Sequence, residues 1–194
     1  MATQKSLFWK NNMNFGAIAG FGIILFSLLL YFLNLQENTA LAFIVFLILI
    51  AVIYLGTKYL RDKIMNGSIS YGRALGSGTA ISLFASVIVA FYMFLFFKFI
   101  DPEAIERYMS MQEDRLYNQP GMTEEQINMA MEMTRKFSTP FTMAIGAIFS
   151  YVFWGFLFSL ITSIFLKKKS NSYDAAMAEI EKELKEDNNN NNGQ

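Results

Sequence analysis

The sequence has 194 residues, and its 16 basic and 16 acidic side chains balance to a net charge of zero, which gives no reason to expect a nucleic-acid partner. It contains no cysteine, which excludes a disulfide framework and a thiol nucleophile. It also contains no histidine, the commonest metal ligand and general base. The length suggests one domain. The apolar share of 54% would also suit a soluble fold, so the distribution of the apolar residues decides the class.

Four stretches without charged residues predict membrane spans at about 15–34, 39–57, 74–97 and 141–166. Each is close to the roughly 20 apolar residues that a helix needs to cross the hydrocarbon core of a bilayer. A helix that is apolar on every side has no polar face for water, and this chain is too short to bury four such helices in a soluble core. We therefore predict an all-α integral membrane protein with four transmembrane helices.

The basic residues near the span ends gather on one side of the membrane. Lys5 and Lys10 precede an apolar run longer than the about 7 to 15 residues of a signal-peptide core, so the first span is expected to be a retained anchor. Nine cations against Asp62 predict that this side is cytoplasmic, and an even number of spans places both termini there. The segment 98–137 on the opposite side holds eight acidic residues and five cations. The nine cations are Lys5, Lys10, Lys58, Arg61, Lys63, Arg73, Lys167, Lys168 and Lys169.

Small residues recur every four positions along the third span. On a helix this spacing places them on one face, and small side chains allow other helices to approach closely. We predict that this face is the packing surface on which the other spans gather. Its residues are Ala74, Gly78, Ser82, Ser86 and Ala90.

The starts of spans one and three share the pattern aromatic-Gly-x-x-x-Gly-x-Gly, at positions 15–22 and 71–78. One interpretation is an internal repeat, in which two helical hairpins are related by an axis along the membrane normal. The other is that glycines serve close helix contact independently at both places. The sequence favours the second interpretation and leaves the first open.

The segment 101–137 between spans three and four predicts an external helical hairpin. Asp101 is expected to cap its first helix, with Pro102 in the first turn. Thr123 and Gln126 have the spacing of a capping box that opens the second helix. Methionine side chains adapt to many surfaces, so those of the hairpin suit packing onto the spans or binding a partner, and we expect the first use. They are Met109, Met111, Met122, Met129, Met131 and Met133.

The fourth span is predicted to begin with a cap at Thr139 followed by Pro140. After its basic stop, the segment 170–194 predicts a cytoplasmic tail with a short amphipathic helix and then a disordered Asn-rich end. The chain is thus expected to divide into a membrane domain, 1–169, and this tail.

Three motifs mark the borders of predicted elements: Ile69-Ser70-Tyr71-Gly72-Arg73-Ala74, Phe99-Ile100-Asp101-Pro102 and Gly121-Met122-Thr123-Glu124-Glu125-Gln126. In these motifs the chain resembles a bacterial membrane family catalogued as domain of unknown function 4199. The resemblance covers nearly the whole chain up to Lys169. It implies a four-span protein of the bacterial inner membrane, and it brings no activity and no site residues.

The span interiors contain none of the ionisable side chains that mark proton relays and ion pathways, which argues against a proton-coupled transporter. An enzyme would have to use the membrane-edge carboxylates Asp101, Glu103 and Glu106, and helix capping explains the first two. We therefore predict no enzymatic activity, no catalytic, cofactor-binding or metal-binding residue, and no cofactor. An uncharged path could be lined by hydroxyls, although these more often bond within their own helix. Candidates are Thr79, Ser82, Ser86 and Ser159.

Two functions fit these features. The first is an interaction or accessory scaffold without catalytic activity, embedded in the lipid bilayer and bound to another membrane protein through the hairpin or the tail. The alternative is a transporter of a small solute or lipid that works as a homo-oligomer, which would rest on the glycines of spans one and three. Neither function involves nucleic acid.

Overall fold

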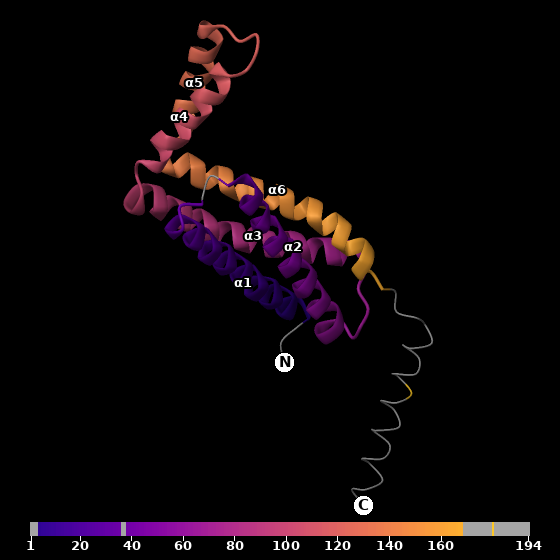
Figure 1. Cartoon of the computed structure of the whole chain (residues 1–194). Helices are drawn as coiled ribbons and strands as arrows, with labels where there is room; N and C mark the ends of the chain where they lie inside the picture. The colour runs from indigo at the N-terminus through magenta and orange to yellow at the C-terminus, as the bar shows by residue number, and fades with distance from the viewer. Residues whose placement is uncertain (1–3, 36–37, 169–179, 181–194) are drawn as a thin grey trace, which may run out of the picture.

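The computed structural model describes residues 4–35, 38–168 and 180 of the chain. These residues form helices and no strand, and four helices are long and apolar enough to cross a membrane. The four are α1 (Gln4–Phe32), α2 (Thr39–Tyr59), α3 (Tyr71–Leu95) and α6 (Pro140–Leu166), as Figure 1 shows. This confirms the predicted all-α membrane protein. Apart from position 180, the predicted tail at 170–194 lies outside the described residues.

Helix α1 begins earlier than the span predicted at 15–34, because its first turns pack against other helices of the bundle. The side chains of Asn11 and Asn12 are buried there. Helices α2 and α3 each continue into a π-helical turn, η1 (Leu60–Ile64) and η2 (Phe96–Ile100). These turns carry both helices beyond the apolar stretches that the sequence marks as spans.

Helix α3 lies at the centre of the bundle and contacts α1, α2 and α6. The small residues predicted to share one face are all buried, which confirms the packing surface. On α6, Ser159 lies against Gly78, and Gly155 lies against Ser82. Each glycine thus leaves room for the side chain of a facing serine, so the two antiparallel helices approach closely.

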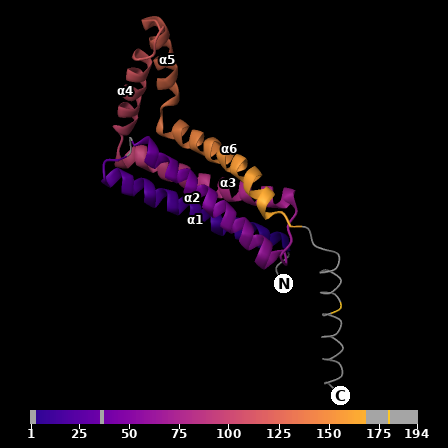
Figure 2. The same ribbon diagram turned by 45° about the vertical axis from the view of Figure 1, so that its right-hand side comes forward.

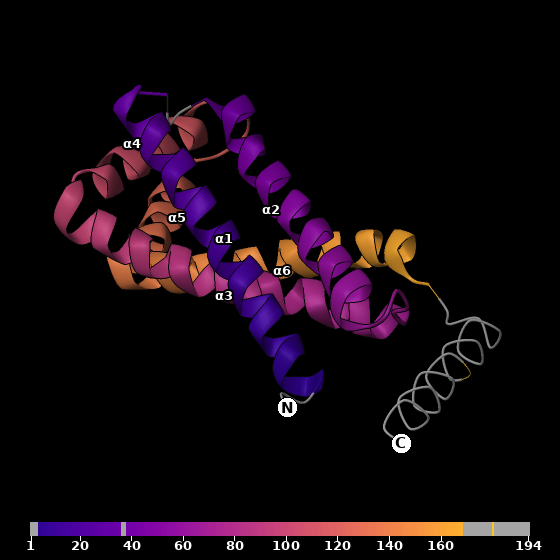
Figure 3. The ribbon, with the colours of Figure 1, turned by 90° about the horizontal axis from the view of Figure 1, so that it is seen from below.

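Helix α1 packs on α3 through glycines of its own. A Cβ atom at Gly16 would lie 2.9 Å from the carbonyl oxygen of Ile81, and one at Gly20 would lie 3.0 Å from the Ile88 side chain. Both distances are shorter than an ordinary carbon contact of about 3.5–4.0 Å, so the close crossing depends on glycine. Figure 3 shows α1 and α2 running obliquely across the pair formed by α3 and α6.

Helices α4 (Ala104–Tyr117) and α5 (Glu124–Phe137) form a hairpin that stands away from the four long helices (Figures 1 and 2). Within it, Ile127 and Met131 are buried. The expectation that the methionines pack onto the spans is wrong for Met129 and Met133, whose side chains are exposed. The hairpin instead builds a small core of its own and leaves part of its apolar surface open.

Side-chain caps fix where α5 and α6 begin. Thr123 Oγ1 accepts a hydrogen bond from the Gln126 N–H, and the Gln126 side chain accepts one from the Thr123 N–H at 3.0 Å. Thr139 and Thr142 form the same reciprocal pair at the start of α6, where Pro140 occupies the first turn. Both predicted caps are confirmed.

The predicted cap at Asp101 is wrong. Helix α4 begins at Ala104, with Glu103 at the N-cap position and no side-chain hydrogen bond. The Asp101 carboxylate accepts a hydrogen bond from the Arg107 guanidinium and is nearly buried. A charged partner one turn into the helix competes successfully with the backbone N–H groups for this carboxylate.

Candidate functional site

Cations from four segments of the chain meet at one end of the bundle, where α1 and α3 begin and α2 and α6 end. Two contacts join these segments: Arg61 Nη1 donates to the Leu166 carbonyl oxygen at 3.4 Å, and the backbones of Ile69 and Lys168 pair as in an antiparallel sheet. We call this the basic end. Its described cations are Lys5, Lys10, Lys58, Arg61, Lys63, Arg73, Lys167 and Lys168.

Polar side chains from three helices meet inside the bundle near the basic end. The Ser77 hydroxyl of α3 donates to Asn12 Oδ1 of α1 at 2.7 Å. Asn11 Nδ2 donates to the carbonyl oxygen of Gly56 on α2 at 3.1 Å. The neighbouring Thr57 is fully buried as well. We call Asn11, Asn12, Thr57 and Ser77 the polar layer.

Two apolar clusters enclose the polar layer. One turn nearer the basic end, Leu60 and Ala74 pack with Met65 and Ile69, and Phe8 lies against them. On the other side lies a larger cluster of residues from α1, α2 and α3, one to two turns from the polar layer along each helix. Its buried members are Ala19, Leu49, Ile53, Ile81 and Ala85. The polar layer is therefore screened from water on both sides along the bundle axis.

Several buried polar atoms of this region make no hydrogen bond to any described residue. They are Asn11 Oδ1, Asn12 Nδ2, Thr57 Oγ1 and, on α6, Ser163 Oγ. A buried polar group without a partner costs about 1–3 kcal/mol, so such atoms favour small molecules that donate and accept hydrogen bonds. The set holds an amide acceptor, an amide donor and two hydroxyls, and no charge. Its chemistry suits a neutral polar molecule.

The sequence does not predict the polar layer, because Asn11 and Asn12 precede the first predicted span at about 15–34. A signal was present in the helical spacing. Phe8, Asn12, Phe15 and Ala19 recur at intervals of four, three and four, which places Asn12 on the face of α1 that packs into the bundle. The partner residues on α2 and α3 could not be read from this spacing.

The hydroxyls considered for an uncharged path bond within their own helices. Thr79 donates to the Leu75 carbonyl oxygen at 2.9 Å, and Ser86 donates to that of Leu83 at 2.7 Å. Ser82 and Ser159 likewise donate to glycine carbonyl oxygens one turn earlier. These hydroxyls are satisfied without a solute, as is common for serine and threonine in membrane helices.

A pocket of about 580 Å³ opens at the basic end between the start of α1, the start of α3 and the loop that precedes α3. Two cations, Lys5 and Arg73, stand beside two aromatic rings, Phe8 and Trp9. No acidic side chain is among its described lining residues, and neither cation makes an ion pair within the described part of the chain. The described residues that line it are Gln4, Lys5, Phe8, Trp9, Met65, Gly72, Arg73 and Gly76.

The glycines that match in the proposed repeat have different surroundings. Gly16 and Gly20 of α1 are pressed against α3, whereas nothing lies within 4 Å of a Cβ atom built at Gly72 or Gly76. The shared pattern therefore does not mark equivalent helix contacts. In the second copy, helix packing uses Gly78, and the other two glycines border the pocket.

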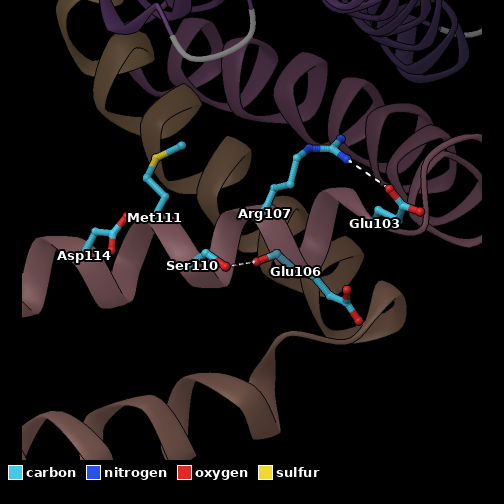
Figure 4. A pocket seen from close by; sticks show the side chains of 6 residues that line it. All are labelled: Glu103, Glu106, Arg107, Ser110, Met111 and Asp114. Carbon is cyan, nitrogen blue, oxygen red and sulfur yellow. Dashed lines mark hydrogen bonds and ion pairs between the residues drawn. The ribbon is translucent and has the colours of Figure 1, made fainter.

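The carboxylates considered for catalysis lie on or next to an open groove of about 520 Å³ along α4. Figure 4 shows Arg107 reaching toward Glu103, 3.9 Å away, while the Glu106 side chain points away from both. Asp101 binds Arg107 from the junction with η2. General acid and base catalysis needs groups that converge on one substrate, whereas Asp101 and Glu103 face the Arg107 guanidinium and Glu106 points away from it (Figure 4). Within the described residues, no cluster of side chains could hold a metal ion.

These features define a multi-pass membrane protein with four apolar helices, a buried polar layer and a cationic pocket at one end. The family described as "Protein of unknown function (DUF4199)" matches residues 14–168, which is most of the chain. The chain belongs to this family, as the resemblance in its motifs implied. No curated protein and no solved structure matches it significantly.

Proposed function

We propose that this protein is a non-catalytic accessory protein of the bacterial inner membrane that binds a second membrane protein through the hairpin formed by α4 and α5. Its basic end would face the cytoplasm, together with both termini. The observation that carries the proposal is the position of the hairpin, which stands clear of the bundle (Figure 2). The hairpin also exposes apolar side chains.

The exposed apolar side chains of α5 form a stripe. Met129, Met133 and Phe137 follow one another at intervals of four and are 65%, 56% and 65% exposed. This spacing places them on one face of the helix. The opposite face buries Ile127 and Met131 inside the hairpin, so the stripe is not needed for the hairpin's own core. Methionine is common on surfaces that bind partners, because its side chain adapts to them.

The charge of the hairpin favours a protein as its partner over the bilayer surface. The segment 98–137 carries eight acidic residues and five cations, so it is net negative. An anionic membrane surface would repel it. A partner with a basic and partly apolar surface would complement both the charge and the stripe. The absence of cysteine and histidine from the sequence supports a non-catalytic role.

Site-specific photocrosslinking in the native membrane tests this proposal. A photoreactive residue at Met129 should form a crosslink to one protein, and the same residue at Asn128, on a different face of α5, should not. The double variant Met129→Gln and Met133→Gln should lose this partner when the tagged chain is purified in mild detergent and analysed by mass spectrometry.

The matched control is the double variant Ser110→Gln and Asn128→Gln, which changes exposed polar positions of the same hairpin. It should retain the partner. Circular dichroism should show equal helix content in both double variants. The proposal fails if the stripe variant keeps its partner, or if crosslinks arise equally from positions 128 and 129.

A second candidate function is passage of a small neutral solute, and the polar layer favours it. Its unpartnered amide and hydroxyl atoms could bind such a solute part of the way through the bundle. The double variant Asn12→Leu and Thr57→Val would remove two of these three atoms, Asn12 Nδ2 and Thr57 Oγ1, while keeping similar volumes. Release of a neutral polyol from proteoliposomes should then fall to the level of protein-free vesicles. Equal release by the parent and by protein-free vesicles would exclude this candidate.

A further inference from the structure

We propose that the pocket at the basic end binds the headgroup of an anionic phospholipid between the start of α1 and the start of α3. Neither the accessory function nor passage of a solute requires this site. Three observations carry it: space that helix packing does not use, two cations that make no ion pair with a described residue, and an aromatic wall.

The space comes from Gly72 and Gly76. The repeated pattern contains six glycines. Four of them, Gly16, Gly20, Gly22 and Gly78, have an atom within 4 Å of the position of an added Cβ, whereas Gly72 and Gly76 have none. Helix packing therefore does not explain glycine here. Larger side chains at both positions would extend into the pocket. The pair keeps open a surface of about the size that a lipid headgroup needs, since ligand pockets usually range from about 300 to 1,000 Å³.

The charge comes from Lys5 and Arg73, which line the pocket from two different helices. Arg73 Nη1 lies 3.3 Å from the Met65 sulfur, a weak and uncharged acceptor. A planar guanidinium can bind two phosphate oxygens at once, and a lysine ammonium adds a second charge at a different angle. A phosphodiester between them would neutralise both sides of the pocket.

The aromatic wall favours a lipid over free phosphate. Phe8 and Trp9 stand edge to face with ring centroids 5.6 Å apart, and the Trp9 ring also contacts Phe84 of α3 at 6.2 Å. These contacts hold the two rings in place beside the cations. Aromatic rings near the end of a membrane-spanning helix favour the headgroup level of a bilayer, where they would contact the glycerol and the first acyl carbons. A soluble anion would leave this surface unused.

The first test removes the charges. The full-length protein is reconstituted in nanodiscs of phosphatidylcholine and phosphatidylglycerol, and the phosphatidylglycerol that remains bound after transfer to detergent is counted by native mass spectrometry. The double variant Lys5→Gln and Arg73→Gln should weaken binding by roughly thirtyfold, the loss expected for two cations near an anionic headgroup. The double variant Lys58→Gln and Lys63→Gln removes equal charge from the same end outside the pocket, and it should bind like the parent.

The second test fills the space and leaves the charge unchanged. Gly76→Leu places a side chain in the pocket, and Gly146→Leu places the same side chain on α6 at another glycine with nothing within 4 Å of its Cβ position. Only Gly76→Leu should lose phosphatidylglycerol. Thermal unfolding should show that both variants are folded like the parent.

Each remaining outcome would overturn the proposal. Equal loss of lipid in the two charge variants would assign binding to the general surface potential. Full binding by Gly76→Leu would exclude the pocket. Displacement of the lipid by excess inorganic phosphate would show that Lys5 and Arg73 bind a soluble anion instead of a lipid headgroup.

Discussion

Gly78 and Gly155 set the distance between α3 and α6, and a larger residue at either position should destabilise the bundle. A Cβ atom at Gly78 would lie 2.9 Å from Ile53 Cγ2 and still closer to Ser159 Oγ. Gly78→Leu should cost about 1–3 kcal/mol through overpacking. At about 2–4 °C for each kcal/mol, the midpoint of thermal unfolding in detergent should fall by several degrees.

Gly146→Leu is the matched control for this prediction, because its Cβ position is open. It should unfold at the temperature of the parent. If Gly78→Leu were equally stable, the close approach of α3 and α6 would be wrong.

Asn12 connects α1 to α3 through its hydrogen bond with Ser77, so Asn12→Ala should also destabilise the protein. The change leaves the buried Ser77 hydroxyl without its acceptor, at a cost of about 1–3 kcal/mol. The exposed Asn14→Ala should be nearly neutral. In a double-mutant cycle, Ser77→Ala should cost less in the Asn12→Ala background than alone. Additive effects would contradict a direct bond between the two side chains.

The residue patterns of the sequence predicted the small face of α3 but not the polar layer. The small residues from Ala74 to Ala90 belong to one helix, so their four-residue spacing was sufficient to predict that they share a buried face. The polar layer depends on contacts between α1 and two other helices, whose register is set by side-chain packing. Asparagine in front of an apolar run suits the headgroup region equally well, so the sequence pattern did not distinguish the two locations.

The hairpin helices are joined to the bundle by an ion pair between Arg107 and Asp101. Asp101 is only 8% exposed, so Arg107→Gln would leave a nearly buried carboxylate without its charged partner. We expect amide hydrogen exchange in the first turns of α4 to become severalfold faster. Lys136→Gln removes an exposed ion pair with Glu132 and should leave exchange in α5 almost unchanged. Equal effects of the two variants would mean that the pair near η2 has no structural role.

The same pair has a defined dependence on pH. The hydrogen bond to Asp101 raises the pKa of Arg107 above its ordinary value. A raised pKa in the folded state means that the stabilisation is complete below the ordinary pKa of arginine and is lost only as pH rises past the raised value. The protection of α4 that depends on Arg107 should therefore be equal at about pH 7 and about pH 10, well below the pKa of arginine.

Helix starts were predictable where the cap and its partner are three residues apart. Thr123 and Thr139 cap their helices through atoms within one turn, so local sequence was sufficient. Asp101 belongs to the same class of residue but binds a side chain six positions away instead. When a more distant cation competes for the capping side chain, local spacing does not show which of the two bonds forms. The direction in which the hairpin projects was also not predictable, because it depends on how η2 and the start of α6 leave the bundle.

At the scale of the whole molecule, the distribution of charge predicts how the bundle lies in the membrane. The basic end brings together cations from four segments, and the hairpin at the other end of α3 is net negative. Under the positive-inside rule this places the basic end in the cytoplasm and the hairpin outside it. The bundle itself is the same in either orientation, so its architecture is independent of this prediction.

Thiol labelling tests the orientation cleanly, because the sequence contains no cysteine and each introduced cysteine is unique. Asn118→Cys, at the end of α4, should react with a membrane-impermeant maleimide on intact spheroplasts. Ser68→Cys, between η1 and α3, should react only after the membrane is permeabilised. The reversed pattern would place the hairpin in the cytoplasm. A protein partner of the stripe and anionic lipids of the pocket would then have to be sought in the opposite compartment and the opposite leaflet.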